Sequence, residues 1–203
     1  MKIKKIYALF QQYPNICIDS RKIKKGAIFI SLKGENFNGN EYAEQAIKDG
    51  CSYAIVDEKE YVNHQNIILV QDALKTLQEI ATYHRFQLNI PIIGITGTNG
   101  KTTSKELINK VLSSEVNCYA TKGNLNNHIG VPLSILEVNK EHKIAIIEMG
   151  ANHQKEIEFL CNIAQPTYGI ITNIGSAHLE GFGSVTAVID TKKELYSYIR
   201  NKK

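Results

Sequence analysis

A chain of 203 residues, with 43% hydrophobic and 22% charged side chains, has enough material for one large or two small globular domains. Its formal net charge of +4 is compatible with anionic small-molecule ligands, and the absence of a basic block interleaved with aromatic residues argues against nucleic acid as a partner. The four cysteines are far apart and form no Cys-x-x-Cys pair, which argues against a zinc site and predicts buried free thiols.

The first residues and the apolar runs of the chain bear on the cellular location of the protein. The first residues do not have the pattern of a signal peptide, and no apolar run has the length of a transmembrane helix. We therefore expect a cytoplasmic protein that does not insert into a membrane.

The first part of the chain, residues 1–88, is predicted to be a small α/β domain. Helices are expected over residues 1–14, 41–49 and 72–86, and strands over residues 15–19, 27–32, 53–56 and 67–70. Asp72 is placed to cap the third helix, and residues 33–40 have the composition of a polar loop. We interpret this domain as one that recruits a substrate, because it precedes the nucleotide motif of the chain.

That motif lies in residues 90–103, where a run of β-branched residues leads into a glycine-containing loop and then a helix start. Strand, glycine-rich loop, Lys-Thr and helix form the phosphate-binding arrangement of nucleotide triphosphatases. Glycines let backbone N–H groups approach phosphate oxygens, Lys101 supplies a positive charge, and the Thr102 hydroxyl is placed to ligate Mg²⁺. The residues expected to hold the ATP phosphates are Thr98, Asn99, Gly100, Lys101, Thr102 and Thr103.

One position departs from the general phosphate-loop pattern. Ile95 stands five residues before Gly100, where that pattern has glycine, so the loop is a variant of it. The structural alternative is an ordinary turn that precedes a helix beginning at Lys101.

Residues 89–203 alternate between predicted strands and helices, which indicates a parallel, doubly wound sheet. Strands are expected over residues 90–95, 117–121, 143–148 and 168–173, and helices over residues 101–113, 154–164 and from 185 onward, with a short helix starting near residue 131. Ligands of such sheets bind at the carboxyl ends of the strands.

Thr102, Glu148 and His178 each follow the carboxyl end of a different predicted strand, and together they suggest a magnesium–nucleotide centre. Glu148 could equally be a surface carboxylate at a strand end, and His178 a solvent-exposed loop histidine. The amides of the Asn-rich loop 124–127 are suited to hold a sugar or a diphosphate, while the alternative is an ordinary turn-forming loop.

Several stretches together resemble the Mur ligase family, the ATP-dependent amide ligases of peptidoglycan precursor synthesis. They are residues 97–103, residues 19–21 with 26–29, residues 34–39, residues 123–132, residues 148–151 and residues 172–184. The last three favour the branch that adds the dipeptide D-alanyl-D-alanine over the branch that adds the third residue to a muramoyl dipeptide. The alternative from another class is a non-catalytic module that binds a UDP-sugar and retains a remnant phosphate loop.

The resemblance implies a reaction and its participants. ATP phosphorylates the carboxylate of a UDP-linked muramoyl peptide, an amine displaces the phosphate, and Mg²⁺ assists; the full-length enzyme is expected to be a monomer. Lys101, His178 and Lys192 are implied as catalytic residues, and Thr102, Glu148, His178 and a carbamylated Lys192 as magnesium ligands. Lys193 is the less favoured alignment for the carbamylated lysine, and an ordinary exposed helix lysine is the structural alternative for Lys192.

The same resemblance implies that Ser20, Arg21 and Asn36 contact the uridine-diphosphate end of the substrate, and that Asn126 or Asn127 contacts its sugar-diphosphate. Residues 38–40 depart from the Asp-Gly-His of many family members. Family members are also considerably longer, so the sequence predicts an N-terminal substrate domain (1–88) followed by an incomplete P-loop-type sheet (89–203), with weak nucleotide binding and no ligase activity of its own.

Overall fold

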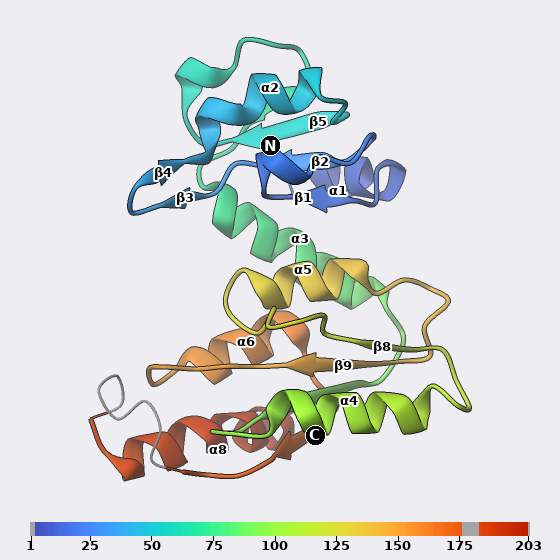
Figure 1. Cartoon of the computed structure of the whole chain (residues 1–203), viewed down its shortest axis with the longest axis vertical. Helices are drawn as coiled ribbons and strands as arrows, with labels where there is room; N and C mark the ends of the chain where they lie inside the picture. The colour runs from blue at the N-terminus through green and yellow to red at the C-terminus, as the bar shows by residue number, and fades with distance from the viewer. Residues whose placement is uncertain (1–2, 176–182, 203) are drawn as a thin grey trace. The chain divides into compact units, whose positions relative to one another are not determined.

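The computed structural model describes residues 3–175 and 183–202, and the chain forms two compact units, Met1–Tyr83 and His84–Lys203 (Figure 1). The division falls inside helix α3 (Ala73–Gln87), a few residues before the boundary expected at residue 88. None of the helices in the described ranges is long and apolar enough to cross a membrane.

The first unit is built on a four-stranded parallel sheet with strand order β1-β2-β5-β6. Its strands are β1 (Ile16–Cys17), β2 (Ile28–Ile30), β5 (Tyr53–Val56) and β6 (Ile67–Leu69), and its helices are α1 (Ile3–Gln12), α2 (Ala43–Lys48) and the start of α3. Three 3-10 turns lie at η1 (Ser20–Lys22), η2 (Gly39–Tyr42) and η3 (Lys59–Tyr61). Asp72 caps α3 as predicted, because its Oδ1 accepts a hydrogen bond of 2.8 Å from the Lys75 amide.

The expectation of a plain polar loop over residues 33–40 is wrong. β3 (Lys33–Gly34) and β4 (Phe37–Asn38) pair as a short antiparallel hairpin, and Phe37 stacks on Tyr42 with ring centroids 5.3 Å apart. The chain can return tightly because Gly39 lies against Leu32, where a Cβ would come within 2.4 Å of the Leu32 carbonyl oxygen. Two-residue strands are too short for a periodicity to reveal.

The second unit contains a parallel sheet with strand order β10-β7-β9-β8, in agreement with the predicted α/β class. The strands are β7 (Ile92–Thr96), β8 (Cys118–Ala120), β9 (Ile144–Glu148) and β10 (Tyr168–Ile171). The helices are α4 (Lys101–Leu112), α5 (Gly130–Glu137), α6 (Glu156–Ala164) and α8 (Val185–Asn201). Apolar β-branched residues fill β7 and β9 because both faces of a parallel sheet are covered by helices.

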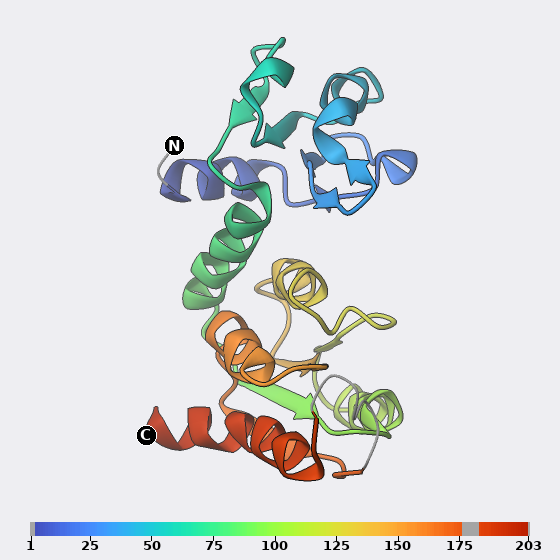
Figure 2. The ribbon, with the colours of Figure 1, turned by 90° about the vertical axis from the view of Figure 1, so that its left-hand side faces the viewer.

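The helices lie on both faces of this sheet. Figure 2 shows α4 and α6 on opposite sides of β7, and α8 packs against α6, β10 and β7. Gly94 of β7 permits α8 to approach the sheet closely, because a Cβ at this position would lie 3.1 Å from atoms of Leu195 of α8 and of Met149. The chain runs from β7 to β8, back to β9 and then across to β10, so a topological switch point lies at the carboxyl ends of the central strands. There Ile95 of β7 pairs with Glu148 of β9.

A buried arginine joins the end of α3 to the end of α6 within the second unit. Arg85 is 7% exposed and donates hydrogen bonds to the carbonyl oxygens of Ala164 (3.0 Å), Leu88 (2.8 Å) and Gln165 (3.2 Å). Carbonyl groups at the C-terminus of a helix have no partner within the helix, so the guanidinium both satisfies them and complements the negative end of the helix dipole.

Replacing Arg85 with methionine keeps an apolar stem but removes these donors. We expect the free energy of unfolding to fall by about 2–4 kcal/mol, measured by urea denaturation followed by circular dichroism. Arg200→Met on the exposed side of α8 is the matched control and should change it by less than about 0.5 kcal/mol. Equal stability of the two variants would contradict the role assigned to Arg85.

Candidate active site

The loop between β7 and α4 is held against the end of β10. Gly97 has φ +146°, and a Cβ at this position would lie 2.0 Å from Thr172 Oγ1, so the close approach requires glycine. The Thr98 amide donates to the Asn173 carbonyl (3.1 Å), and the Asn99 amide donates to Asn173 Oδ1 (2.9 Å). Gly100 precedes the helix with φ +76° and has open space around it. The loop therefore presents backbone at the N-terminus of α4, the geometry that binds anions.

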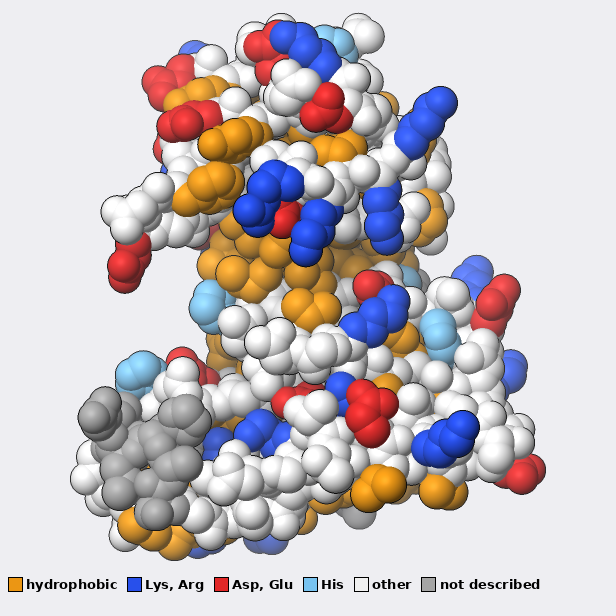
Figure 3. Space-filling view, viewed as in Figure 1, with side chains coloured by type: hydrophobic (Ala, Val, Ile, Leu, Met, Phe, Trp, Pro, Cys, Tyr) orange, Lys and Arg blue, Asp and Glu red, His pale blue; other side chains and the backbone are white. Residues whose placement is uncertain are grey.

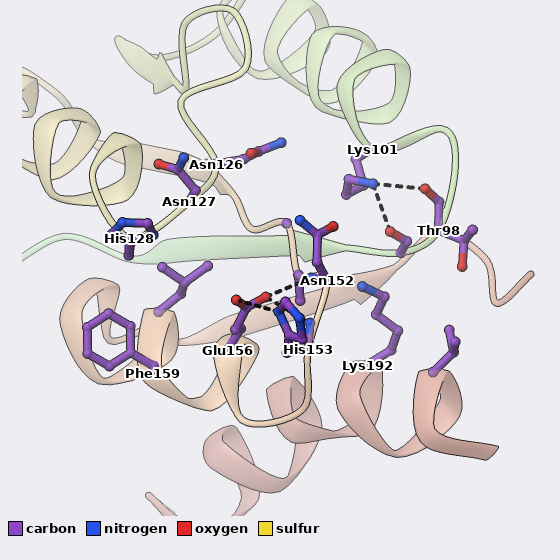
Figure 4. Close-up of a pocket in the computed structure, with 15 residues that line it drawn as sticks. Thr98, Lys101, Asn126, Asn127, His128, Asn152, His153, Glu156, Phe159 and Lys192 are labelled. Carbon is purple, nitrogen blue, oxygen red and sulfur yellow. Dashed lines mark hydrogen bonds and ion pairs between the residues drawn. The ribbon is translucent and has the colours of Figure 1, made fainter. Parts of the chain in front are cut away.

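The two motif residues that begin α4 have different partners. Lys101 Nζ donates to the carbonyl oxygens of Gly97 (2.8 Å) and Thr98 (2.9 Å), and burial lowers the pKa of this ammonium group (Figure 4). Thr102 Oγ1 donates to Glu148 Oε2 at 3.0 Å. The structure thus brings together the predicted phosphate loop and the predicted carboxylate.

Glu148 is a buried carboxylate with partners on both oxygens, not a surface group at a strand end. It is 1% exposed, and its Oε1 accepts a 2.8 Å hydrogen bond from Asn126 Nδ2. A hydroxyl and a carboxylate are the hard oxygen donors that Mg²⁺ prefers, so Thr102 and Glu148 fit such an ion, with phosphate oxygens and water able to complete its shell. Within the described ranges no three His, Cys, Asp or Glu side chains converge on a further metal site, and His178 lies outside those residues.

Beside this pair lies a cavity of about 340 Å³ at the carboxyl edge of the sheet (Figure 4). Side chains that line it include Thr98, Lys101, Asn126, Asn127, His128, Asn152, His153, Glu156, Phe159 and Lys192. Lys192 enters the cavity from α8 and is 3% exposed, whereas Lys193 is exposed and lies 3.9 Å from Asp190. Burial and the positive charge of Lys101 lower the pKa of Lys192 to about 8, so part of this amine is neutral near that pH.

Several residues of the cavity wall were not predicted from the sequence, among them Asn152, His153 and Glu156. The Glu156 carboxylate accepts from the amides of Asn152 (2.6 Å) and His153 (3.0 Å), which fixes the loop before α6. A glutamate in the first turn of a helix that follows a polar loop is a capping signal, and that signal was available in the sequence. Glu194 of α8 reinforces the same loop, because its carboxylate accepts from the amides of Lys155 (2.7 Å) and Glu158 (2.9 Å).

The predicted substrate-binding residues fall into two groups. Asn126 and Asn127 line the cavity, and Asn127 Oδ1 also accepts from the Ile129 and Gly130 amides, so it serves the turn before α5 as well. Ser20, Arg21 and Asn36 belong to the first unit. Arg21 is paired with Asp19 at 2.9 Å, which lowers the pKa of that carboxyl to about 2, and Asn36 lies in a shallow cavity of about 370 Å³ along the β3–β4 hairpin.

Comparisons with known proteins identify relatives of both units. The family model "Mur ligase middle domain" matches residues 95–203, and "Mur ligase family, catalytic domain" matches residues 12–93. UDP-N-acetylmuramoyl-tripeptide--D-alanyl-D-alanine ligases of Synechocystis sp. and Bacillus subtilis are 41% and 37% identical to this chain over 91% of its length. The chain covers 41% of each, so it spans about two fifths of these curated relatives.

Solved structures of MurF ligases have a fold similar to that of this chain. A crystal structure of MurF from Acinetobacter baumannii superposes with a TM-score of 0.85 and 39% identity, covering 91% of this chain and 41% of that one. MurF ligase from Thermotoga maritima in complex with ADP superposes with a TM-score of 0.83 and 34% identity, covering 91% of this chain and 43% of that one.

The environment of Lys192 makes a prediction that needs no ligand. Competitive acetylation across a pH series, read by mass spectrometry, should give this amine a midpoint near pH 8. Lys101→Met should raise the midpoint, because it removes a nearby positive charge, and Lys192→Met should abolish the signal. A midpoint near that of an unperturbed lysine, about 10.4, would show that the site does not shift the amine.

Proposed function

This chain belongs to the Mur ligase family, and we propose that its residues serve an ATP-dependent ligase that joins D-alanyl-D-alanine to UDP-N-acetylmuramoyl-tripeptide. The printed names of the curated relatives support this substrate pair. The observation that carries the proposal is the 3.0 Å hydrogen bond between Thr102 of the phosphate loop and the buried Glu148. Its neighbours Lys101 and Asn126 line a cavity that Lys192 also lines. As part of this proposal, the full-length enzyme is a cytoplasmic monomer.

In this proposal the second unit holds Mg–ATP. The backbone N–H groups from Thr98 to Thr103 and the Lys101 ammonium bind the phosphates, and Thr102 and Glu148 hold the metal. ATP supplies the phosphoryl group that activates a substrate carboxylate for attack by an amine, with release of phosphate. The chain's own contribution is charge and position: Lys101 exchanges its two carbonyl partners for phosphate oxygens, at a helix end that favours negative charge.

Lys192 is proposed to act as a carbamate. Its neutral amine adds to carbon dioxide, a C–N bond forms, and one proton leaves, which converts a cation into a carboxylate-like group. Two observations support this: the buried amine lies in the same cavity as Lys101, and its pKa is lowered to about 8, so the neutral form is accessible. The carbamate and His178 would be the further magnesium ligands.

The first unit, residues 1–88, is proposed to recruit the UDP end of the substrate, and residues 89–203 to form the ATP-binding part. Ser20, Arg21 and Asn36 would contact the uridine diphosphate, with Arg21 supplying positive charge. The hairpin cavity, with the exposed ring of Phe37 beside Tyr42, offers a surface of suitable chemistry. Asn126 and Asn127 would contact the sugar-diphosphate in the second unit.

Binding of Mg–ADP by isothermal titration calorimetry tests the nucleotide site. Lys101→Ala should weaken binding at least about tenfold, because it removes a charge-assisted contact to phosphate. Arg21→Ala in the first unit is the matched control: it should leave Mg–ADP binding unchanged and weaken binding of UDP-muramoyl tripeptide. Retained UDP-ligand binding with no effect of Lys101→Ala on nucleotide would favour a non-catalytic module, and preference for the muramoyl dipeptide would favour the other ligase branch.

The carbamate has a spectroscopic signature of its own. With ¹³C-bicarbonate near pH 8, a carbamate carbon resonance should appear in the wild-type chain, persist in Lys193→Met and disappear in Lys192→Met. An unchanged resonance in Lys192→Met would place the carbamate on another amine.

A further inference from the structure

Lys105, a lysine with no part in the proposed reaction, is completely buried behind Glu148. It lies on α4 one turn after Lys101, its side chain is 0% exposed, and it does not line the cavity. Burying an ammonium group is costly unless it is paired and hydrogen-bonded. The contacts of the Lys105 side chain therefore indicate which parts of the structure it stabilises.

The ammonium group joins three parts of the second unit. Lys105 Nζ donates to the carbonyl oxygens of Thr121 (2.5 Å) and Gly123 (3.5 Å), directly after β8. It also lies 3.0 Å from Glu106 Oε1 on its own helix and 4.0 Å from Glu148 Oε2 at the end of β9. Glu106 is 61% exposed, so the partners that depend on the buried position are the two carbonyl groups and Glu148.

Thr121, which accepts a hydrogen bond from Lys105, is also hydrogen-bonded to Glu148. Its backbone amide donates to the Ile146 carbonyl (2.9 Å), and its Oγ1 accepts from the Glu148 amide (3.0 Å). The loop then returns to the same carboxylate through Asn126 Nδ2, and the Asn126 carbonyl accepts from the Gly150 amide at 2.7 Å. Lys105 is therefore linked by hydrogen bonds to the loop of residues 121–127, and this loop in turn hydrogen-bonds to both the backbone amide and the carboxylate of Glu148.

We propose that Lys105 is a positioning residue, which holds Glu148 and the loop of residues 121–127 in the geometry needed for the metal and for the amides of Asn126 and Asn127. It acts through Thr121 and through Glu148 itself. The importance of this geometry for catalysis rests on the proposed function; the claim that Lys105 holds the loop does not.

Hydrogen–deuterium exchange of the 203-residue chain tests the claim without a ligand. In Lys105→Met, exchange should become about tenfold faster in peptides covering residues 121–127 and 148–150, and stay unchanged in the first unit and in α6. Lys110→Met, on the exposed side of the same helix, and Glu106→Gln, which removes only the surface ion pair, should leave all these peptides unchanged. Unchanged exchange at 121–127 in Lys105→Met overturns the proposal, as does an equal effect of Glu106→Gln.

Two further variants keep the test decisive. Lys105→Arg restores charge and donors, and should return exchange to within about threefold of wild type, which a requirement for lysine packing alone would not do. If Lys105→Met unfolds the unit, Thr121→Val, which removes the acceptor of the Glu148 amide at nearly constant volume, should accelerate exchange at 148–150. No acceleration there overturns the proposal.

The magnesium dependence of ADP binding distinguishes the positioning effect of Lys105 from the electrostatic effect of its positive charge. Loss of positioning in Lys105→Met should weaken the apparent Mg²⁺ affinity about tenfold, because Mg²⁺ demands near-ideal ligand geometry. Tighter Mg²⁺ binding, expected if the only effect were removal of a positive charge 4.0 Å from Glu148, would contradict positioning. A wild-type chain that does not bind Mg–ADP would refute the proposed function, while the exchange measurement would still decide the role of Lys105.

Discussion

The buried carboxylate of Glu148 is the constraint around which the second unit is arranged. A carboxylate at 1% exposure is tolerated only where hydrogen bonds and positive charge replace its water. Those partners come from the start of α4, from the loop after β8 and from the interior of α4, through Thr102, Asn126 and Lys105. Stabilising this one group thus joins α4, the loop after β8 and the end of β9, and leaves its oxygens beside the phosphate loop.

The order of the strands makes this meeting possible. Because β9 lies next to β7, Glu148 at the end of β9 pairs with Ile95, which lies near the end of β7 just before the phosphate loop. On the other side, the segment directly after β10 supplies Thr172 and Asn173, which hydrogen-bond to the backbone of Thr98 and Asn99. The loop is therefore fixed by the sheet before any anion arrives, and a preorganised site loses less entropy when it binds.

The α6 side of the cavity is stabilised by two other carboxylates, which accept hydrogen bonds from backbone amides. Glu156 and Glu194 capture the amides that α6 and its preceding loop leave without helical partners. Because Glu194 and Lys192 belong to the same helix, the contact that docks α8 against α6 also sets where the Lys192 amine lies. Cations of the two helices α4 and α8 thereby share one cavity, and their mutual repulsion helps to lower the pKa of Lys192.

Features encoded within a few neighbouring residues could be determined from the sequence: the β7–α4 phosphate loop, the Asp72 cap, the buried strands and the parallel α/β class. Each depends on local geometry and on a periodicity that is visible in one segment. The hairpin at residues 33–38 was too short for such a signal. Only the tertiary structure decided which face of α4 is buried: Lys105 is 0% exposed, while the apolar Leu107 and Val111 are 65% and 69% exposed. Figure 3 shows hydrophobic side chains on the surface in the region where Figure 1 places α4. The physical reason is that the groups that make this burial favourable, the carbonyl oxygens of Thr121 and Gly123 and the carboxylate of Glu148, reach Lys105 only when the sheet is assembled.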